Sequence, residues 1–384
     1  LEDIYNFTGI DKWFLTKLKI IVNHEEKLSK INKLDKEILK VSKKIGFSDE
    51  TIASLTNNNI EEIRNLRKKW SILPTYKMVD TCASEFEALT PYYYSTYESE
   101  NEAEPDKTDK AIVLGSGPIR IGQGIEFDYC SVHAAWSLQK RNIDSIFINS
   151  NPETVSTDFD TSDRLYFEPI DQESVFDILE NEQTSKSFPA TIVQFGGQTA
   201  INLTKKLENE KYPILGTSAK STELASDRGY FEEITSKIGV PQPPAGTSIN
   251  YDEAKKIANQ INYPVIVRPS FVLGGMAMRI IDNDIDLENY FNEHDFSNLI
   301  NPEILIDKYI EGIELEIDAV SDGKDILIPG IMMHLEKAGV HSGDSVAVYP
   351  AKGITEFERN IILEYSKKIA QEINIIGLMN IQFI

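Results

Sequence analysis

Residues 111–130 read AIVLGSGPIRIGQGIEFDYC, and this stretch decides the fold of the middle of the chain. An apolar run that predicts a buried strand leads into a glycine-rich loop and then into a predicted helix. Such a loop presents backbone N–H groups at a helix N-terminus, where an anion can be held. Gly115 and Gly117 have the spacing of a dinucleotide-binding loop, but Arg120 takes the place of its third glycine. The next predicted strand leads to Ser150 where a ribose-binding acid would stand, so the pattern argues against an NAD site.

A long polar run, NPETVSTDFDTSD at residues 151–163, follows that second strand and precedes the apolar residues LYF at 165–167. Together with residues 111–130, the run closely resembles the large chain of carbamoyl phosphate synthetases. More narrowly, NPETVSTDFDTSDRLYFEP is similar to the second synthetase half of that chain, the half that phosphorylates carbamate. The resemblance extends through nearly all of the sequence. It is therefore far more specific than a lone glycine loop.

The composition limits the class of protein independently. A length of 384 residues with 41% apolar residues predicts two to four domains with real cores. A net charge of -22, from 61 acidic and 39 basic residues, disfavours nucleic acid and anionic membranes as partners. The two cysteines, Cys82 and Cys130, are too few for a disulfide framework and fit a reducing cytoplasm. No export signal or apolar run long enough for a membrane span is present, and both ends predict a fragment of a longer polypeptide.

The first quarter of the chain predicts a helical domain. Apolar residues recur at helical spacing over residues 1–97. Asp11 is predicted to cap one helix, and Asn59 with Glu62 resembles the capping box of another. In the resembling family this region is the oligomerisation domain. The acidic and almost aliphatic-free stretch ESENEAEPDKTD predicts a linker over residues 98–109.

Two further domains are expected, which makes the fold class α/β. Residues 110–215 alternate apolar strands with helices and predict a doubly wound parallel sheet, the domain that precedes ATP-grasp in the resembling family. Residues 216–384 contain a strand at 263–268, a glycine-rich turn at 269–275 and a strand at 276–281. This pattern resembles the phosphate-covering hairpin of the ATP-grasp fold. The sequence has no Walker loop, G-x-x-x-x-G-K-[ST]. The resemblance therefore implies a truncated ATP-grasp domain.

The resemblance places an ATP site in this third domain. Arg268 matches the phosphate-binding arginine of the family, and Gly274 and Gly275 match the glycines that let the backbone close over phosphates. A structural ion pair and a plain tight hairpin are the alternatives. The adenine edge would be read by backbone groups at Lys308 and Ile310.

Other positions complete the implied site. Glu314 matches the acid that holds the ribose hydroxyls, although charged and apolar residues alternate in EGIELEIDA, which also fits a solvated strand face. Arg228 resembles the arginine that approaches the carboxylated intermediate, with a surface ion pair as the alternative. The sequence GVHS resembles a nucleotide-contacting loop and consists of Gly339, Val340, His341 and Ser342.

Gln382 matches the first of three positions that bind Mg²⁺ or Mn²⁺ in the family. The other two, a glutamate and an asparagine, would follow residue 384. One carboxamide cannot hold the metal well, so we expect these 384 residues alone to bind nucleotide weakly and to be catalytically weak or inactive.

The implied reaction converts carbamate and MgATP to carbamoyl phosphate and ADP, within a synthesis from bicarbonate, glutamine-derived ammonia and two ATP. Arg228 and Arg268 would act by positioning and charge neutralisation. The implied partners are a glutaminase small subunit or domain and further copies of this chain. The pathways implied are arginine and pyrimidine biosynthesis, between which the residues do not distinguish. Two alternatives remain: another ATP-grasp carboxylate ligase, such as a biotin carboxylase relative, and a non-catalytic assembly fragment.

Overall fold

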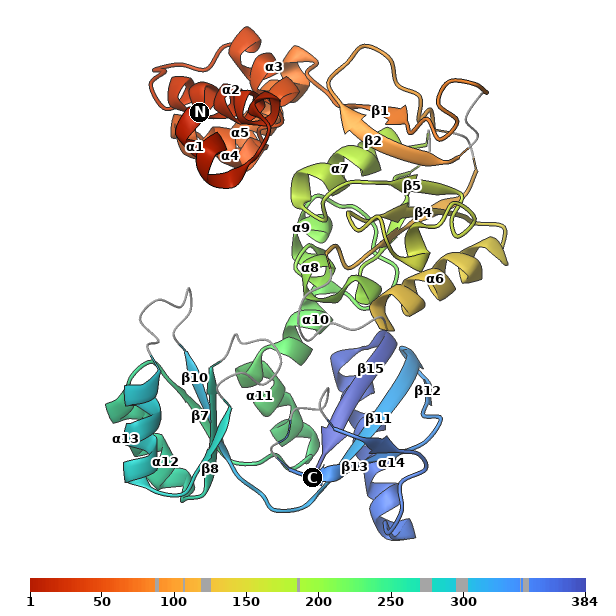
Figure 1. The fold of residues 1–384 in the computed structure, drawn as a ribbon. Helices are drawn as coiled ribbons and strands as arrows, with labels where there is room; N and C mark the ends of the chain where they lie inside the picture. Colours follow the sequence, from red (N-terminus) through yellow and green to blue (C-terminus); the bar gives the residue numbers. More distant parts are fainter. Residues whose placement is uncertain are drawn as a thin grey trace. The chain divides into compact units, whose positions relative to one another are not determined.

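The computed structural model describes residues 1–86, 90–105, 108–118, 126–184, 187–269, 278–294, 303–338, 340 and 345–384. It divides into two compact units, one formed by residues 1–118 with 127–213 and the other principally by residues 214–384 (Figure 1). Each unit is considered by itself. Within the described residues, no helix combines the length and the apolar character needed to cross a bilayer.

The first unit begins with five helices: α1 (Glu2–Thr8), α2 (Lys12–Leu28), α3 (Lys36–Ile45), α4 (Asp49–Thr56) and α5 (Ile60–Trp70). Both predicted caps are confirmed. Asp11 accepts a hydrogen bond from the backbone N–H of Trp13 at 2.8 Å, and Asn59 with Glu62 forms a capping box on α5. The helices enclose a small apolar core whose fully buried members include Leu28, Leu39, Ile52 and Ile63.

The same unit contains a six-stranded sheet in the order β1-β2-β5-β4-β3-β6. Its strands are β1 (Thr75–Met78), β2 (Tyr92–Thr96), β3 (Lys110–Leu114), β4 (Asp144–Ile148), β5 (Arg164–Tyr166) and β6 (Ala190–Ile192). Five strands run parallel and β1 is antiparallel to β2, so the predicted doubly wound parallel sheet is confirmed. The connecting helices are α6 (Glu126–Gln139), α7 (Gln172–Asn181), α8 (Gly197–Ile201) and α9 (Thr204–Asn209), with short 3₁₀ turns η1 (Val155–Thr157) and η2 (Gln194–Gly196).

The predicted helical domain ends earlier in the chain than expected. Helical structure stops at Trp70, and residues 75–96 contribute two strands instead. The tyrosine-rich segment forms a strand because its side chains pack on the sheet: Tyr93 is buried, with its ring 5.5 Å from that of Tyr166. The prediction that residues 1–97 are all helical is therefore wrong for this segment.

The stretch expected to be an acidic linker is bonded to strand β1, at the edge of the sheet. The side chain of Asn101 accepts a hydrogen bond from the backbone N–H of Tyr76 at 2.9 Å, and the side chain of Glu102 accepts one from the N–H of Met78 at 2.7 Å. Ala103 is fully buried. Two carboxylates of this stretch also pair with Lys77. Residues 98–105 therefore form part of the first unit rather than a free connection.

Two glycine-containing turns meet at the carboxyl edge of the sheet. Gly117 has a positive φ of 71° and donates its N–H to the Asn149 side chain at 3.0 Å. A Cβ on Gly196 would lie 2.5 Å from the carbonyl oxygen of Gly115, so that close approach requires glycine. Residues 119–125 of the loop lie outside the described residues.

The second unit contains two antiparallel sheets. The first has the order β7-β10-β8-β9 and consists of β7 (Ala245–Ser248), β8 (Val265–Pro269), β9 (Arg279–Ile281) and β10 (Ile304–Lys308). Helices α12 (Tyr251–Ile261) and α13 (Asp284–Glu293) share its core (Figure 1). The second sheet pairs β11 (Ile313–Asp322) with β12 (Ile326–Leu327), β13 (Met332–Lys337) and β15 (Ile376–Phe383), and β13 with β14 (Ala347–Val348). The remaining helices are α10 (Ala219–Ser226), α11 (Arg228–Ile238) and α14 (Glu356–Ile373).

Candidate nucleotide site

Both predicted catalytic arginines converge on one carboxylate in the second unit. Arg228 is the first residue of α11, where the side chain of Asp227 caps the helix, and Arg268 lies near the end of β8. The guanidinium of Arg228 forms a short ion pair with Asp307 on β10, and Nε of Arg268 lies 3.9 Å from the other oxygen of that carboxylate. Sequence reasoning named the two arginines but missed Asp307, because only the pairing of β8 with β10 brings it between them.

The two arginines differ in how firmly they are held. The Arg228 side chain is 34% exposed and its ion pair is close, whereas the Arg268 side chain is 48% exposed and its contact with the same carboxylate is at the outer limit of an ion pair. An exposed ion pair at that distance contributes little to stability. Arg268 is therefore the cation that can turn to an incoming anion at small cost, and Asp307 restrains Arg228.

Lys308 and Ile310 follow Asp307 at the end of β10. The ammonium of Lys308 donates to the carbonyls of Asn262 and Tyr263 at 2.8 and 3.1 Å, and its backbone N–H donates to Pro244 at 2.8 Å. An adenine contact at Lys308 would therefore have to use a group other than this amide. Ile310 is 38% exposed.

Glu314 belongs to a polar face of the second sheet. On β11, Glu314, Glu316 and Asp318 alternate with the buried residues of the opposite face. The imidazole of His334, on β13, is 2% exposed; its Nε2 lies 2.8 Å from Glu316 and its Nδ1 lies 3.3 Å from Glu314. Glu314 and Glu316 are thus partly buried beside a buried histidine, whereas Asp318 on the same face is exposed.

The last strand extends the same face. The side-chain amide of Asn380 donates to Glu316 at 2.7 Å and to Asp318 at 2.9 Å. Gln382, which is exposed, lies opposite Glu316 in the register of β15 with β11. The alternation of polar and apolar residues could have revealed the face from the sequence, but His334 and Asn380 are placed on it by strand pairing.

A cavity of about 680 Å³ brings together three predicted nucleotide contacts, Ile310, Glu314 and Gln382. The rest of its wall is largely apolar and comes from α11, α14, the end of β15 and residues 241–244. Its size and its composition, apolar with a few polar groups at one side, are those of a small-molecule pocket. Arg228, Arg268 and Lys308 are not part of this wall.

Several predicted positions fall outside the described residues, namely Gly274, Gly275, Gly339, His341 and Ser342. Val340 is described and is 39% exposed. In the part of the chain that the structure describes, no three His, Cys, Asp or Glu side chains are placed to hold a metal ion. Gln382 and the neighbouring carboxylates supply oxygen donors of the kind that Mg²⁺ prefers, so they fit a metal that also receives oxygens from a bound phosphate.

Comparison with known proteins shows to which family the chain belongs. Residues 1–71 match the carbamoyl-phosphate synthetase large chain, oligomerisation domain; residues 107–224 match the carbamoyl phosphate synthase preATP-grasp domain; and residues 227–384 match the carbamoyl-phosphate synthase L chain, ATP binding domain. The carbamoyl phosphate synthase large chain of Caldanaerobacter subterraneus subsp. tengcongensis is 52% identical over 383 residues, which is 100% of this chain and 35% of that protein. The chain belongs to the carbamoyl phosphate synthase large-chain family.

This chain spans about a third of the length of that family relative. All the site residues discussed above lie within residues 227–384 of this chain, the part that matches the ATP binding domain. Two solved structures share the fold. The biotin carboxylase domain of Hydrogenobacter thermophilus 2-oxoglutarate carboxylase, determined with MgADP, ADP and bicarbonate, is 22% identical with a TM-score of 0.55, over 72% of this chain and 61% of that one. Campylobacter jejuni biotin carboxylase is 20% identical with a TM-score of 0.55, over 71% and 61%.

At these identities the two biotin carboxylases bear on the fold alone, and they confirm the predicted α/β class with an ATP-grasp domain. The family assignment rests on the large-chain relative and on the three domains. It confirms the resemblance that was read from residues 111–130 and from NPETVSTDFDTSD.

Proposed function

We propose that this chain carries the part of a carbamoyl phosphate synthase that phosphorylates carbamate with ATP. The single observation that carries the proposal is the 52% identity, along the whole chain, to a carbamoyl phosphate synthase large chain. The geometry of the second unit supports it, because a half-exposed arginine, an acidic face and an apolar cavity lie within one ATP binding domain. The reaction would belong to a synthesis from bicarbonate, glutamine-derived ammonia and two ATP.

Each site residue named in the preceding section has a role in this proposal. Arg268 neutralises charge on the transferred phosphoryl group, and Asp307 keeps Arg228 oriented toward the carbamate. Glu314 holds the ribose hydroxyls, with His334 fixing its carboxylate. The apolar cavity beside Ile310 receives the adenine. Phosphoryl transfer needs positioning and charge neutralisation more than covalent chemistry, which suits this set of groups.

The proposed cofactors are ATP with Mg²⁺ or Mn²⁺. The metal would neutralise charge on the phosphates of the nucleotide. Gln382 would be its ligand from this chain, since its exposed carboxamide stands beside Glu316 at the edge of the cavity. Gly274, Gly275, Gly339, Val340, His341 and Ser342 would add backbone and side-chain contacts to the nucleotide.

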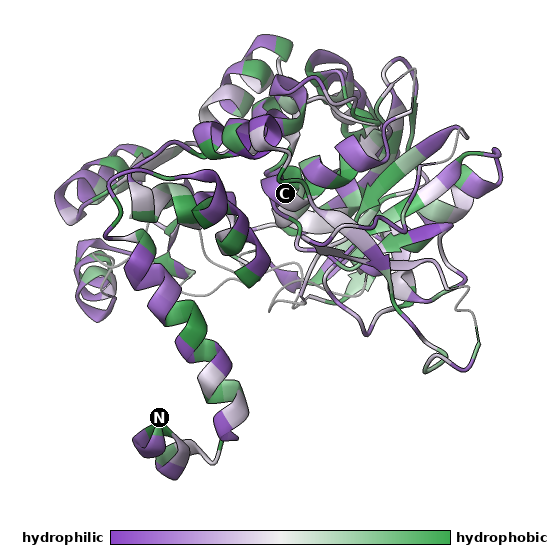
Figure 2. Ribbon diagram, turned by 90° about the horizontal axis from the view of Figure 1, so that it is seen from above, coloured by the Kyte–Doolittle hydropathy of each residue, from purple (hydrophilic) through white to green (hydrophobic). Residues whose placement is uncertain are grey.

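The proposed partners are a glutaminase subunit or domain and further copies of this chain. The family match of residues 1–71 is an oligomerisation domain, which supports assembly with other subunits. The first two helices carry exposed apolar side chains, which include Phe7, Trp13, Phe14 and Leu18. In Figure 2 the ribbon near the N-terminus alternates between hydrophobic (green) and hydrophilic (purple) segments. We further propose that the enzyme works in the cytoplasm, in arginine or pyrimidine biosynthesis.

The test uses the complete enzyme with Arg268→Ala and measures ATP formation from ADP and carbamoyl phosphate. One charge-assisted contact is worth about 1.5–3 kcal/mol, so we expect the rate to fall roughly 10- to 100-fold. Lys237→Ala is the matched control, because Lys237 is a 69% exposed cation that pairs with Glu372 away from the cavity. An Arg268→Ala enzyme as fast as wild type would refute the assignment of Arg268. A wild-type enzyme that forms no ATP from carbamoyl phosphate would refute the proposed reaction.

A further inference from the structure

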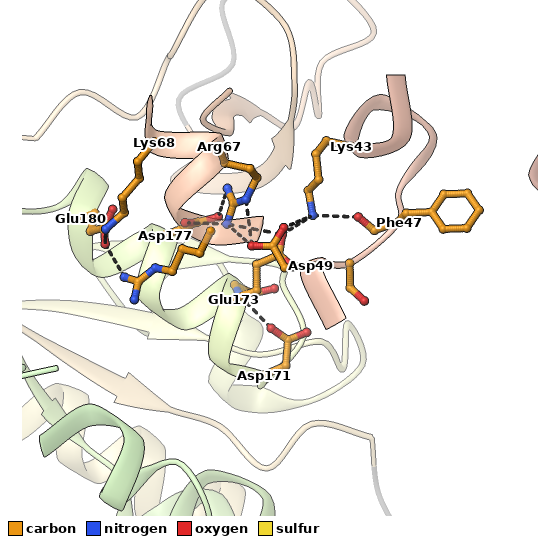
Figure 3. Close-up of polar contacts among 12 residues, drawn as sticks. Lys43, Phe47, Asp49, Arg67, Lys68, Asp171, Glu173, Asp177 and Glu180 are labelled. Atoms are coloured by element: carbon orange, nitrogen blue, oxygen red, sulfur yellow. Dashed lines mark hydrogen bonds and ion pairs between the residues drawn. The ribbon is translucent and has the colours of Figure 1, made fainter. Parts of the chain in front are cut away.

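A cluster of buried charges joins the N-terminal helices to helix α7 of the sheet (Figure 3). Arg67 on α5 contacts Asp49 on α4 at 2.8 Å and Asp177 on α7 at 3.1 Å. Lys43 on α3 contacts Asp49 at 3.2 Å and forms a short ion pair with Glu173 on α7. Residues 1–71 and 107–224 match separate domains of the family, so these contacts connect two domains.

The cluster contains three carboxylates and only two cations. The carboxylates are Asp49, Glu173 and Asp177, and the cations are Lys43 and Arg67. Apart from Glu173, which is 19% exposed, none of these side chains is more than 7% exposed. One negative charge is therefore left over in a region from which water is largely excluded. An uncompensated buried charge is costly, and a group in that position tends to take up a proton.

Asp177 is the carboxylate best placed to accept the proton. Arg67 from α5 faces it directly, as do the carboxylates of Glu173 on its own helix and Asp49 on α4. Tyr76 on β1 and Tyr97, after β2, are the other titratable groups near it, and Lys43 lies on the far side of Glu173. Burial, and then the neighbouring acids, raise the pKa of Asp177 to about 6 despite Arg67. A cavity of about 400 Å³ lined by Lys43, Glu173 and Asp177 gives water a route to it.

We propose that this cluster is a proton-controlled joint, in which uptake of one proton by Asp177 neutralises the buried charge and tightens the docking of the N-terminal helices on α7. Above the titration range the joint carries an unpaired negative charge and opens more readily. The folded pKa of Asp177 lies above its ordinary value of 3.8, so the extra stability is present at low pH and is lost as pH rises through about 6. Between pH 5 and pH 7.5 the opening equilibrium should increase about tenfold.

The direction of the pH dependence distinguishes Asp177 from His24, another titrating group in the helices. Burial lowers the pKa of His24, whose Nε2 lies 2.8 Å from Ser42, so its effect on stability is the opposite: stability rises with pH over the range in which the histidine loses its proton. Glu168 also has a pKa raised by burial, and its carboxylate accepts a hydrogen bond from the backbone N–H of Ser95 rather than from Arg67. Each of these residues therefore needs a variant of its own.

The test is hydrogen exchange of the α3–α5 amides in the full chain at pH 5 and pH 7.5, corrected for the intrinsic pH dependence of exchange. In wild type, the protection factors of these amides should be about tenfold lower at pH 7.5 than at pH 5. Asp177→Asn, which copies the shape of the neutral acid, should show no such change, and Glu168→Gln should behave as wild type. Equal protection of wild type at both pH values would overturn the proposal, as would an unchanged loss in Asp177→Asn.

A second measurement reads the titration in the wild-type protein and uses the variant only for assignment. The side-chain carboxyl carbon of Asp177, followed by NMR in wild-type protein labelled at aspartate, should titrate with a midpoint near 6. The resonance is assigned by its absence from the Asp177→Asn spectrum. A midpoint below about 4.5, close to an ordinary aspartate, would contradict the joint.

Discussion

The two units use ion pairs in opposite ways. In the first unit, Arg67 is 1% exposed and is surrounded by three carboxylates that belong to two other helices, α4 and α7. In the second unit, Arg268 is 48% exposed and faces a single carboxylate at 3.9 Å. The buried arginine cannot exchange its partners without opening the fold, whereas the exposed one can. The same residue type therefore maintains architecture in one unit and is available to a ligand in the other.

The largest effect is expected from Arg67→Met, which removes the central cation of the buried cluster. Three carboxylates would then face only Lys43, and breaking a buried ion pair by removing one partner costs about 3–5 kcal/mol. Urea denaturation, read as the free energy of unfolding of the first unit, measures this loss. Lys30→Met is the matched control, because Lys30 is 77% exposed and pairs only with Glu26, four residues earlier; its change should stay below about 1 kcal/mol. Equal losses in the two variants would remove the distinction between buried and exposed pairs.

A smaller loss is expected from His334→Ala in the second unit. The substitution leaves the carboxylates of Glu314 and Glu316 beside each other without the imidazole between them, at a cost of about 1–3 kcal/mol in the free energy of unfolding. His133→Ala is the control, since His133 is exposed on α6, and it should change stability by less than about 0.5 kcal/mol. If His334→Ala were as mild as the control, the acidic face would not depend on the histidine, and its proposed role in fixing Glu314 would fail.

The smallest effect concerns the ribose. Glu314→Gln should weaken MgATP binding about fivefold, since one hydrogen bond is worth about 1 kcal/mol. The variant should also lose the ability to distinguish ATP from 2′-deoxy-ATP, which wild type is expected to retain. Glu311→Gln serves as the control, because Glu311 is 76% exposed and pairs only weakly with Lys337. Undiminished discrimination in Glu314→Gln would assign the ribose to another group.

The parts of the fold that were predicted correctly are those in which local pattern and burial agree. Strands β3 and β4 are apolar runs next to turn residues, and both lie inside their sheet with every residue after the first buried. Strand β2 was missed because it pairs with β5, about seventy residues further along the chain, and β1 was missed with it because β1 pairs with β2.

The residues of the candidate site also fall into those that could be predicted from local sequence and those that could not. Arg228, Arg268 and Glu314 could be named from motifs, because each follows a recognisable local sequence. Asp307, His334 and Asn380 could not, since each enters the site only through the register of a neighbouring strand or through a contact across the sheet. Lys308 was also named from a motif, and the sequence could not show that its backbone N–H already donates to the carbonyl of Pro244.

We propose that the second unit binds ATP through Arg268, and does not only share a fold with proteins that bind ATP. Isothermal titration of the 384-residue chain with MgATP tests it most directly, in wild type, Arg268→Ala and Lys237→Ala. The account predicts saturable binding to wild type and to Lys237→Ala, and an affinity about 10- to 100-fold lower for Arg268→Ala, with the free energy of unfolding unchanged. No saturable binding to wild type, or the same affinity in wild type and Arg268→Ala, would contradict it.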